Sequence, residues 1–301
     1  MRAPVAALYR AYLACRQPSA CGKIRFSGVS GYDVYNPTAP FADNGRWLIA
    51  ARVEPRNSER SQVHFFHWPG GEEARLLAEL PVFDLQDPFV CRIADRTVLG
   101  GVEVEFSPDD SVLRWRTRFL VGPSVADLQP LSQGPWGMKD IRLVELADQR
   151  ILVFTRPQGQ PGGRGTIGWM IIDSLAELNP QNIVRATLLE QVDENDWCGV
   201  NEAHLLADGR IGVLAHVARF DAQQNRHYYA ASFVFDPGSG SCSPIKIITC
   251  RDDFLPGASK RDDLHDVVFP GGLYGMPGAE VRLFCGTSDC EVQWRSLPAP
   301  F

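Results

Sequence analysis

The sequence of 301 residues lacks the features that mark several large classes of protein. It has no apolar run approaching the roughly 18 residues that a membrane-spanning helix needs, so no membrane partner is expected. It has no tract of Lys and Arg, and its net charge is −6, which argues against a nucleic-acid partner. Arg10 interrupts what would be the apolar part of a signal peptide, which favours a short amphipathic helix and a cytoplasmic location.

Common catalytic and metal-binding signatures are missing as well. The eight cysteines show no CxxC spacing, which favours reduced thiols over disulfides or a metal site. There is no GxSxG nucleophile turn and no P-loop, and the GxGxxG spacing at residues 163–168 leads into a strand-like run instead of a helix. His204 and His216 have no clear third partner for zinc. We therefore expect neither a metal nor another cofactor.

Short strand-like runs dominate what is present. They are rich in β-branched and aromatic residues and are bounded by Gly, Pro, Asp or Asn. Convincing helical periodicity is confined to residues 3–16. Regularly punctuated short strands are typical of a sandwich, a barrel or a propeller. The clearest runs cover residues 106–120, 150–155, 166–172, 228–235 and 281–285.

One pattern recurs five times and favours the propeller. A polar anchor is followed by an apolar run, a small polar turn and a second apolar run, and the anchors are about 50 to 65 residues apart. We predict one all-β domain over residues 1–301, a five-bladed β-propeller with a short N-terminal helix; a two-sheet sandwich is the alternative. The innermost strands of a propeller begin at the central channel, so the anchors should converge there. They are Asn36, Asp87, Asp140, Asn201 and Asp266.

Asp87 is the best candidate for a catalytic acid. Pro88 follows it directly and biases Asp87 to an extended conformation. Phe83 and Phe89 are expected to desolvate the carboxyl group, which would raise its pKa and allow it to donate a proton. The alternative is an aspartate that caps a turn through local backbone hydrogen bonds.

Two segments in the middle of the chain supply positive charge. Strand alternation places Asp140 and Arg142 on one face and Lys139 on the other, where they can bind sugar hydroxyls or an anion, or form a local ion pair. The glycine-rich loop that follows carries Arg156 and Arg164. Their guanidinium groups and the loop amides can wrap a phosphate, with an ordinary hairpin loop as the alternative.

Other polar residues of the repeats are candidate ligands for a sugar. The acid-rich segment 260–266 lacks the spacing of an EF-hand loop, so hydroxyl recognition by Asp263 or Asp266 is favoured over calcium binding, with a solvated loop as the alternative. Sugar or anion binding likewise suits the fourth repeat better than zinc. The expected substrate-binding residues are Asn36, Arg52, Lys139, Asp140, Asn201, Glu202, Asp266 and Asp289.

The sequence also resembles, over nearly its whole length, the family catalogued as domain of unknown function 1861. That family includes the mannosyltransferase-phosphorylases and is more distantly similar to glycoside hydrolase family 130, the five-bladed-propeller β-mannoside phosphorylases. The matching motifs occur in order: DVYNPTAPF (33–41), ARVE (51–54), MKDIRLVEL (138–146), VFTRPQG (153–159), GGRG (162–165), VNEAHLL (200–206) and DVVFPGG (266–272).

The resemblance implies roles for individual residues. Residues 86–89, Gln-Asp-Pro-Phe, stand where family 130 has Glu-Asp-Pro-Arg, which implies Asp87 as the proton donor. His216 matches a phosphate-binding histidine at the end of a strand in the fourth blade, and residues 284–289 echo a closing motif that ends in aspartate. A phosphorylase also needs cations for its phosphate. The implied phosphate ligands are Arg156, Arg164 and His216, with Lys139 as an additional cation.

The resemblance implies a reaction in which phosphate attacks a β-mannoside with inversion and releases mannose 1-phosphate, or the reverse transfer of mannose. The expected partners are a sugar or sugar phosphate and inorganic phosphate. One alternative is an inverting glycoside hydrolase that uses Asp87 with Glu202 or Asp140 as its acid–base pair. The other is a sugar-binding propeller without catalysis. The arginines of the glycine loop favour the phosphorylase.

Overall fold

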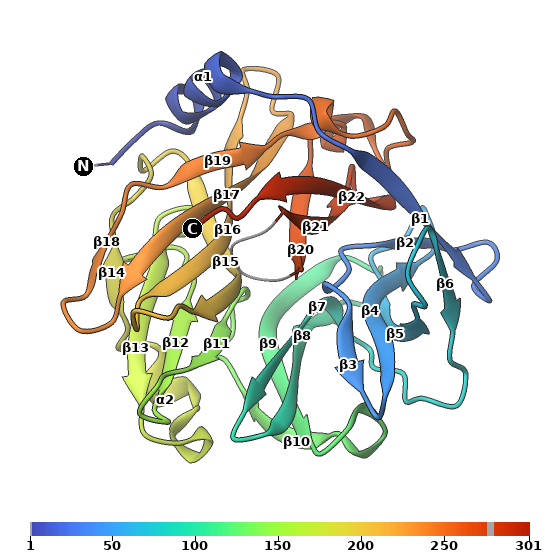
Figure 1. Cartoon of the computed structure of the whole chain (residues 1–301), viewed down its shortest axis with the longest axis horizontal. Coiled ribbons are helices and arrows are strands. Elements are labelled where there is room, and N and C mark those ends of the chain that lie inside the picture. Colours follow the sequence, from blue (N-terminus) through green and yellow to red (C-terminus); the bar gives the residue numbers. More distant parts are fainter. Residues whose placement is uncertain (1, 276–279) are drawn as a thin grey trace.

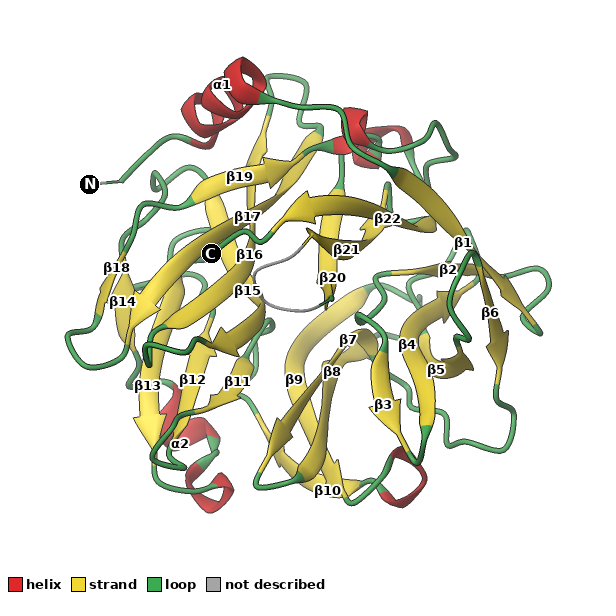
Figure 2. Cartoon of the chain, viewed as in Figure 1, coloured by secondary structure: helices red, strands yellow, loops and turns green. Residues whose placement is uncertain are grey.

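The computed structural model describes residues 2–275 and 280–301, and the fold is nearly all β (Figure 2). Helix α1 (Val5–Cys15) lies where the periodicity predicts a helix, and α2 (Pro180–Ile183) is a single turn. The prediction of an all-β chain with a short N-terminal helix is therefore confirmed. Within the described ranges, no helix has the length and apolar character needed to cross a membrane. Four short 3-10 turns are η1 (Val125–Asp127), η2 (Leu175–Glu177), η3 (Arg251–Asp253) and η4 (Asp262–Leu264).

The strands form four sheets that follow one another around the molecule in chain order (Figure 1). Three of them are antiparallel and each comes from one continuous stretch of chain. The second sheet contains β7 (Gln86–Ile93), β8 (Arg96–Phe106), β9 (Val112–Gly122) and β10 (Gln129–Gln133). The third contains β11 (Arg142–Glu145), β12 (Ile151–Thr155), β13 (Ile167–Ile172) and β14 (Thr187–Leu189). The fourth contains β15 (Trp197–Leu205), β16 (Ile211–Phe220), β17 (Arg226–Asp236), β18 (Ser241–Cys242) and β19 (Lys246–Thr249).

The first sheet joins the two ends of the chain. Its order is β2-β4-β5-β6-β1-β22-β21-β20, with β3 on β4. Strand β1 pairs in parallel with β6 and antiparallel with β22, so it links the first strands to the last hairpin. Four sheets rule out a two-sheet sandwich, whereas five closed blades remain a prediction. The bounds are β1 (Cys21–Ser27), β2 (Asp33–Tyr35), β3 (Phe41–Asp43), β4 (Arg46–Glu54), β5 (Gln62–His67), β6 (Glu73–Leu76), β20 (Val268–Tyr274), β21 (Glu280–Thr287) and β22 (Glu291–Pro298).

One expected strand is a hairpin. The run predicted over residues 106–120 is wrong at its start, because β8 ends at Phe106 and β9 begins at Val112. Between them the Ser107 N–H donates to the Ser111 carbonyl at 2.9 Å, and Asp110 has a φ of 64°. Pro108 and the aspartates that follow it favour such a turn. The β8–β9 hairpin therefore projects as a wall beside the site described below.

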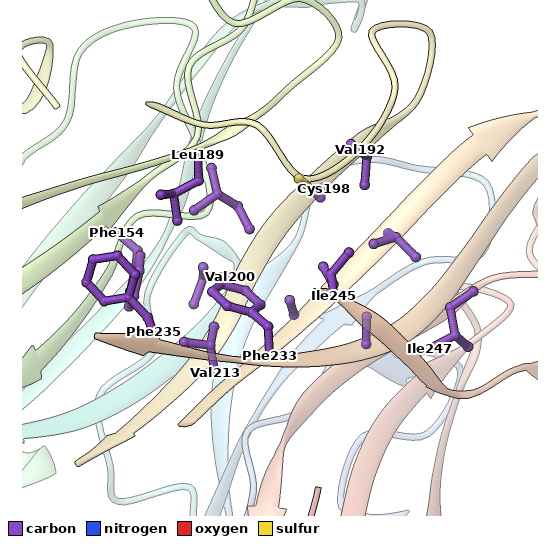
Figure 3. Packing of buried hydrophobic residues seen from close by; sticks show 14 of the residues in the cluster. Phe154, Leu189, Val192, Cys198, Val200, Val213, Phe233, Phe235, Ile245 and Ile247 are labelled. Atoms are coloured by element: carbon purple, nitrogen blue, oxygen red, sulfur yellow. The ribbon is translucent and has the colours of Figure 1, made fainter. Parts of the chain in front are cut away.

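The largest apolar core lies between the third and fourth sheets (Figure 3). Phe154 of β12 is fully buried, and its ring meets that of Phe235 of β17 edge-on at 5.5 Å. Val200 and Val213 fill the space beside them, and Cys198 is a buried free thiol. This core fixes β15 and β16, which carry two of the polar residues at the centre of the molecule.

Phe154→Ala is expected to lower the free energy of unfolding by about 3–5 kcal/mol, because it removes a buried ring and leaves a cavity. Urea unfolding followed by circular dichroism measures the loss. The matched control is Leu113→Ala on the exposed hairpin, with 56% of Leu113 accessible to solvent; we expect a change within about 0.5 kcal/mol there. Equal losses in the two variants would contradict the packing of this core.

Candidate functional site

The polar anchors of the sequence repeat lie where the strands nearest the centre are interrupted. Asn36 lies between β2 and β3, which both pair with β4, and Asp140 lies just before β11. The β7–β8 register shifts across Asp87, and the β15–β16 register shifts across Asn201. Such irregularities redirect a side chain out of the alternating pattern. Asn36, Asp87 and Asp140 also share a left-handed backbone, with φ of 44°, 50° and 59°, which Asn and Asp tolerate better than most residues.

Asp87 is buried and held by two partners from the first sheet. Its Oδ1 accepts a hydrogen bond from Asn36 Nδ2 at 2.8 Å. The same oxygen accepts a second hydrogen bond from Arg52 Nη1 at 3.2 Å, and this contact is also an ion pair. Burial alone would raise its pKa, but the charges of Arg52 and Lys139 and the Asn36 hydrogen bond outweigh it and lower the pKa. The expectation of a raised pKa, drawn from Phe83 and Phe89, is therefore wrong. The left-handed φ likewise replaces the extended conformation expected before Pro88.

Arg52 belongs to a buried charge network that the sequence did not reveal. Its Nη2 lies 2.7 Å from Glu54 Oε2 and 3.1 Å from Glu59 Oε2. Lys260, which comes from the far end of the chain, donates to Glu54 and, at 3.0 Å, to Glu59. Tyr35 OH also donates to Glu54. Arg52, which holds Asp87, therefore shares two glutamates with a second cation, Lys260.

A second buried network joins the third and fourth sheets. Arg156 Nη1 donates to Asp140 Oδ2 at 2.7 Å, and Arg142 Nη2 lies 3.8 Å from Asp140 Oδ1. His216 Nε2 is 3.9 Å from Asp140 Oδ2, while its Nδ1 makes a 2.8 Å hydrogen bond with Asn201 Oδ1. The glycine loop packs directly on this group, because a Cβ on Gly165 would lie only 2.7 Å from Arg156 Nε.

The protonation states of this network follow from its burial and charges. Burial, together with the nearby Arg156 and Lys139, lowers the pKa of His216 to about 3, despite the opposing charge of Asp140. Burial disfavours the ionisation of Asp140. The charges of Arg156, Lys139 and His216 nevertheless hold the pKa of Asp140 far below the usual range. At neutral pH the pair is therefore an ionised aspartate and a neutral histidine.

Four buried polar atoms around the two networks have no hydrogen-bond partner among the described residues. Unpartnered buried polar groups are uncommon in native proteins and are costly unless something bonds to them. Three of them belong to anchors and the fourth to a residue bonded to one, so a polar ligand that binds at the anchors can supply their missing partners. They are Asn36 Oδ1, Asp140 Oδ1, Asn201 Nδ2 and His216 Nε2.

A cavity of about 460 Å³ lies beside these networks and is rich in positive charge. Lys139, Arg156, Arg164 and Arg226 line it, and Glu59 is the one acidic residue among its lining. Arg164 is exposed and lies over the Phe220 ring at 5.1 Å. Trp115, Trp197, Phe220 and Tyr228 supply aromatic walls. The cavity can hold an anion between cations and an apolar or sugar group against the rings.

A second cavity, of about 710 Å³, adjoins the first. The two share Glu59, Gln86, Val102 and Val104 as lining residues. In the second cavity Arg60 is paired with Asp110. In the first, Arg156 and Arg226 are also ion-paired, whereas Lys139 and Arg164 have no ion-pair partner among the described residues. Gln86 immediately precedes Asp87, so the border between the cavities lies next to the proposed acid.

Two expected site residues make their contacts elsewhere. Asp266 accepts hydrogen bonds from His227 Nδ1 at 2.6 Å and Tyr229 OH at 3.1 Å. Glu202 pairs with His204 at 2.8 Å and accepts a backbone hydrogen bond from Leu273 N, also at 2.8 Å. The structure does not bring either into the two networks, and their assignment as substrate ligands stays a prediction.

Asp289, by contrast, lies beside the Arg52 network. It has a left-handed φ of 48° and makes no hydrogen bond or ion pair with residues 2–275 or 280–301. Burial and the charges of Asp87 and Glu59 raise its pKa to about 6, against the lowering effect of Arg52 and Lys260. Asp289 is thus the carboxyl of this group that most readily holds a proton near neutral pH.

The protein-family model described as Protein of unknown function (DUF1861) matches residues 14–301. MPT-4 from Leishmania mexicana, a mannose phosphorylase solved with phosphate ion, is 32% identical with a TM-score of 0.92 and covers 99% of this chain and 93% of its own. MPT-1 from the same organism, a GDP-Man-dependent mannosyltransferase, is 30% identical with a TM-score of 0.91, and the match covers 99% of this chain and 96% of the MPT-1 chain. A β-1,2-mannobiose phosphorylase from Listeria innocua shares the fold at 12% identity and a TM-score of 0.65, covering 89% and 91%. No protein with a curated description matches the sequence.

Asp289→Asn should stabilise the protein at alkaline pH. The pKa of Asp289 is about 6 in the folded protein, above that of an unfolded aspartate, so the folded state loses stability as pH rises through 6. The variant should gain about 3 kcal/mol at pH 8 and almost nothing below pH 4. Urea unfolding across this pH range measures the difference. Asp208→Asn, whose side chain is exposed and pairs with Arg210, is the control; a gain independent of pH would contradict the assignment.

Proposed function

Because the chain belongs to the DUF1861 family, we propose that it is a carbohydrate-active enzyme that moves a mannosyl group between phosphate and another acceptor. In one direction phosphate attacks a β-mannoside with inversion and mannose 1-phosphate is released; in the other, mannose passes from an activated donor to a sugar. The observation that carries the proposal is the buried Asp87 close to a cluster of cations with unpartnered polar atoms. The names of the similar Leishmania mexicana proteins support the same chemistry.

The cation-lined cavity is the proposed phosphate site. Arg156 and Lys139 lie at its inner end, close enough to act on Asp140, and Arg164 lies at its exposed side. A phosphate there would exchange its hydration for guanidinium and ammonium donors. Neutral His216 donates its one N–H to Asn201 Oδ1, so its Nε2 can accept a hydrogen bond from a hydroxyl group of the phosphate or the sugar. Phosphate is already an anionic nucleophile, so the attacking group needs no general base.

Asp87 is the proposed proton donor, and phosphate binding supplies the reason that it becomes protonated. In the free protein Arg52 and Lys139 keep its pKa low. A phosphate in the cavity adds negative charge and offsets the charge of Lys139, which raises the pKa of the nearby carboxyl group. Asp87 then takes up a proton as the nucleophile arrives and can deliver it to the departing sugar through a hydroxyl group.

The hydrolase alternative finds less support. An inverting hydrolase needs a second carboxylate free to activate water. Asp140 is ion-paired with Arg156 at 2.7 Å, and its lowered pKa makes it a weak base. Glu202 is occupied by His204 and a backbone amide. Neither candidate is available in the way that such a mechanism requires.

We also infer that the four sheets make a single five-bladed propeller. Divided at the parallel β1–β6 pair, the nine-stranded sheet gives two units of four strands, one of which carries an extra strand. Together with the three other sheets these make five units. The interrupted strands then face a common centre, as the contacts among Asn36, Asp87 and Arg52 suggest. A cytoplasmic location would agree with eight free cysteines.

Incubation of the protein with mannosides, with and without inorganic phosphate, tests the reaction. We expect mannose 1-phosphate only when phosphate is present, and at least a 100-fold loss of turnover for Asp87→Asn, because a general acid contributes roughly that factor or more. Asp208→Asn, on an exposed turn, should keep full activity. Free mannose released without phosphate would indicate a hydrolase. Sugar binding with no turnover under any donor or phosphate condition would indicate a binding protein.

A further inference from the structure

Glu59 lies where the two cavities meet, although it is no part of the sequence repeat. It is in the loop between β4 and β5 and lines both cavities. Its carboxylate accepts from Arg52 Nη2 at 3.1 Å, Lys260 Nζ at 3.0 Å and Arg261 Nη1 at 3.2 Å. Its backbone carbonyl accepts from the side chain of Gln86 at 2.8 Å. The loop is therefore fastened to the residue that precedes Asp87.

The Arg52 guanidinium is shared among three carboxylates. Glu54 receives Nε and Nη2 at 3.0 and 2.7 Å, Glu59 receives Nη2, and Asp87 receives Nη1 at 3.2 Å. The side chains of Glu54 and Asp87 are 0% and 6% exposed, whereas that of Glu59 is 41% exposed. Glu59 is thus the member of the three that a ligand in either cavity can reach.

We propose that Glu59 is a positioning residue that shares the Arg52 guanidinium with Asp87, and so weakens the hold of Arg52 on that carboxyl and keeps it available as a proton donor. The role rests on the proposed function, in which Asp87 must take up a proton. Without the Glu59 charge, the positive charge of Arg52 would act on Asp87 with less compensation. Asp87 would then release its proton at a lower pH.

Several other charged groups act on this cluster and are unchanged by a substitution at Glu59. They come from four separate segments, so no single loop movement removes them together. Facing Asp87 are Arg52, Lys139, Asp140, Arg142 and Asp289; facing Glu59 are Arg52, Lys260, Arg261 and Asp289.

The test is the pH dependence of kcat for phosphorolysis at saturating phosphate and mannoside in Glu59→Gln, because kcat reports the ionisation of the bound enzyme, in which Asp87 holds its proton. The alkaline limb is the pH range in which the proton donor loses its proton. It should move to lower pH by roughly one pH unit, the shift expected when one negative charge that shares Arg52 with Asp87 is removed. Glu59→Asp keeps the negative charge, so its alkaline limb should lie close to that of the unsubstituted protein. Glu105→Gln is the matched control, because Glu105 pairs with Arg114 on the hairpin wall and does not contact Arg52; its limb should stay in place.

A uniform loss of rate at every pH, or a lower Tm with the limb unmoved, would overturn the proposal. The titration midpoint of Asp87 can also be measured without turnover, by carbon-13 NMR of the aspartate carboxyl groups. The Asp87 signal is identified by its absence in Asp87→Asn. Its midpoint should fall to lower pH in Glu59→Gln. If phosphorolysis is absent but this midpoint moves, the proposed function fails while the coupling through Arg52 stands; an unmoved midpoint overturns the coupling itself.

Discussion

Two buried guanidinium–carboxylate pairs, Arg52 with Asp87 and Arg156 with Asp140, hold the centre of the molecule together. Each side chain in them is at most 6% exposed. A buried charge is tolerated only when it is paired and hydrogen-bonded, so each partner fixes the other. The pairs also fix the backbone: the carboxylates lie on left-handed residues at interruptions of the strands, where an ordinary strand would point them elsewhere.

These pairs also decide the charge state of the free protein. Asp87 and Asp140 are ionised, His216 is neutral, and Lys139 has no ion-pair partner among the described residues. The centre therefore favours an incoming anion, and an anion there would in turn favour protonation of its neighbours. Ligand binding and proton uptake are coupled in this view, because the same cations stabilise the phosphate and the ionised form of Asp87.

The sequence predicted what depends on local pattern. The repeat located the interruptions at Asn36, Asp87, Asp140 and Asn201, because an anchor and its flanking apolar runs are contiguous in the chain. The mostly β character and the N-terminal helix followed from periodicity in the same way. The hairpin at residues 107–111 was missed because aromatic and β-branched residues on both sides masked a five-residue turn.

What the sequence did not predict depends on partners distant in the chain. Phe83 and Phe89 suggested a raised pKa for Asp87, but Arg52, 35 residues away, reverses the direction. Lys260 reaches Glu59 across 201 residues, and no local signal marks that contact. Asp266 fits the pattern of an anchor yet bonds to His227, since β17 offers it a nearer partner. Partner identity is set by the assembled sheets, which a single sequence does not display.

Proton uptake on anion binding is the most direct measurement of this coupling. Sulfate has the charge of a phosphate dianion but no proton to exchange near neutral pH, so calorimetric titration of sulfate in buffers of different ionisation enthalpy reports protons taken up by the protein alone. We predict net proton uptake near pH 7 that is largely lost in Asp87→Asn. Sulfate binding without proton uptake, or with uptake unchanged in that variant, would contradict the coupling between the cations and Asp87.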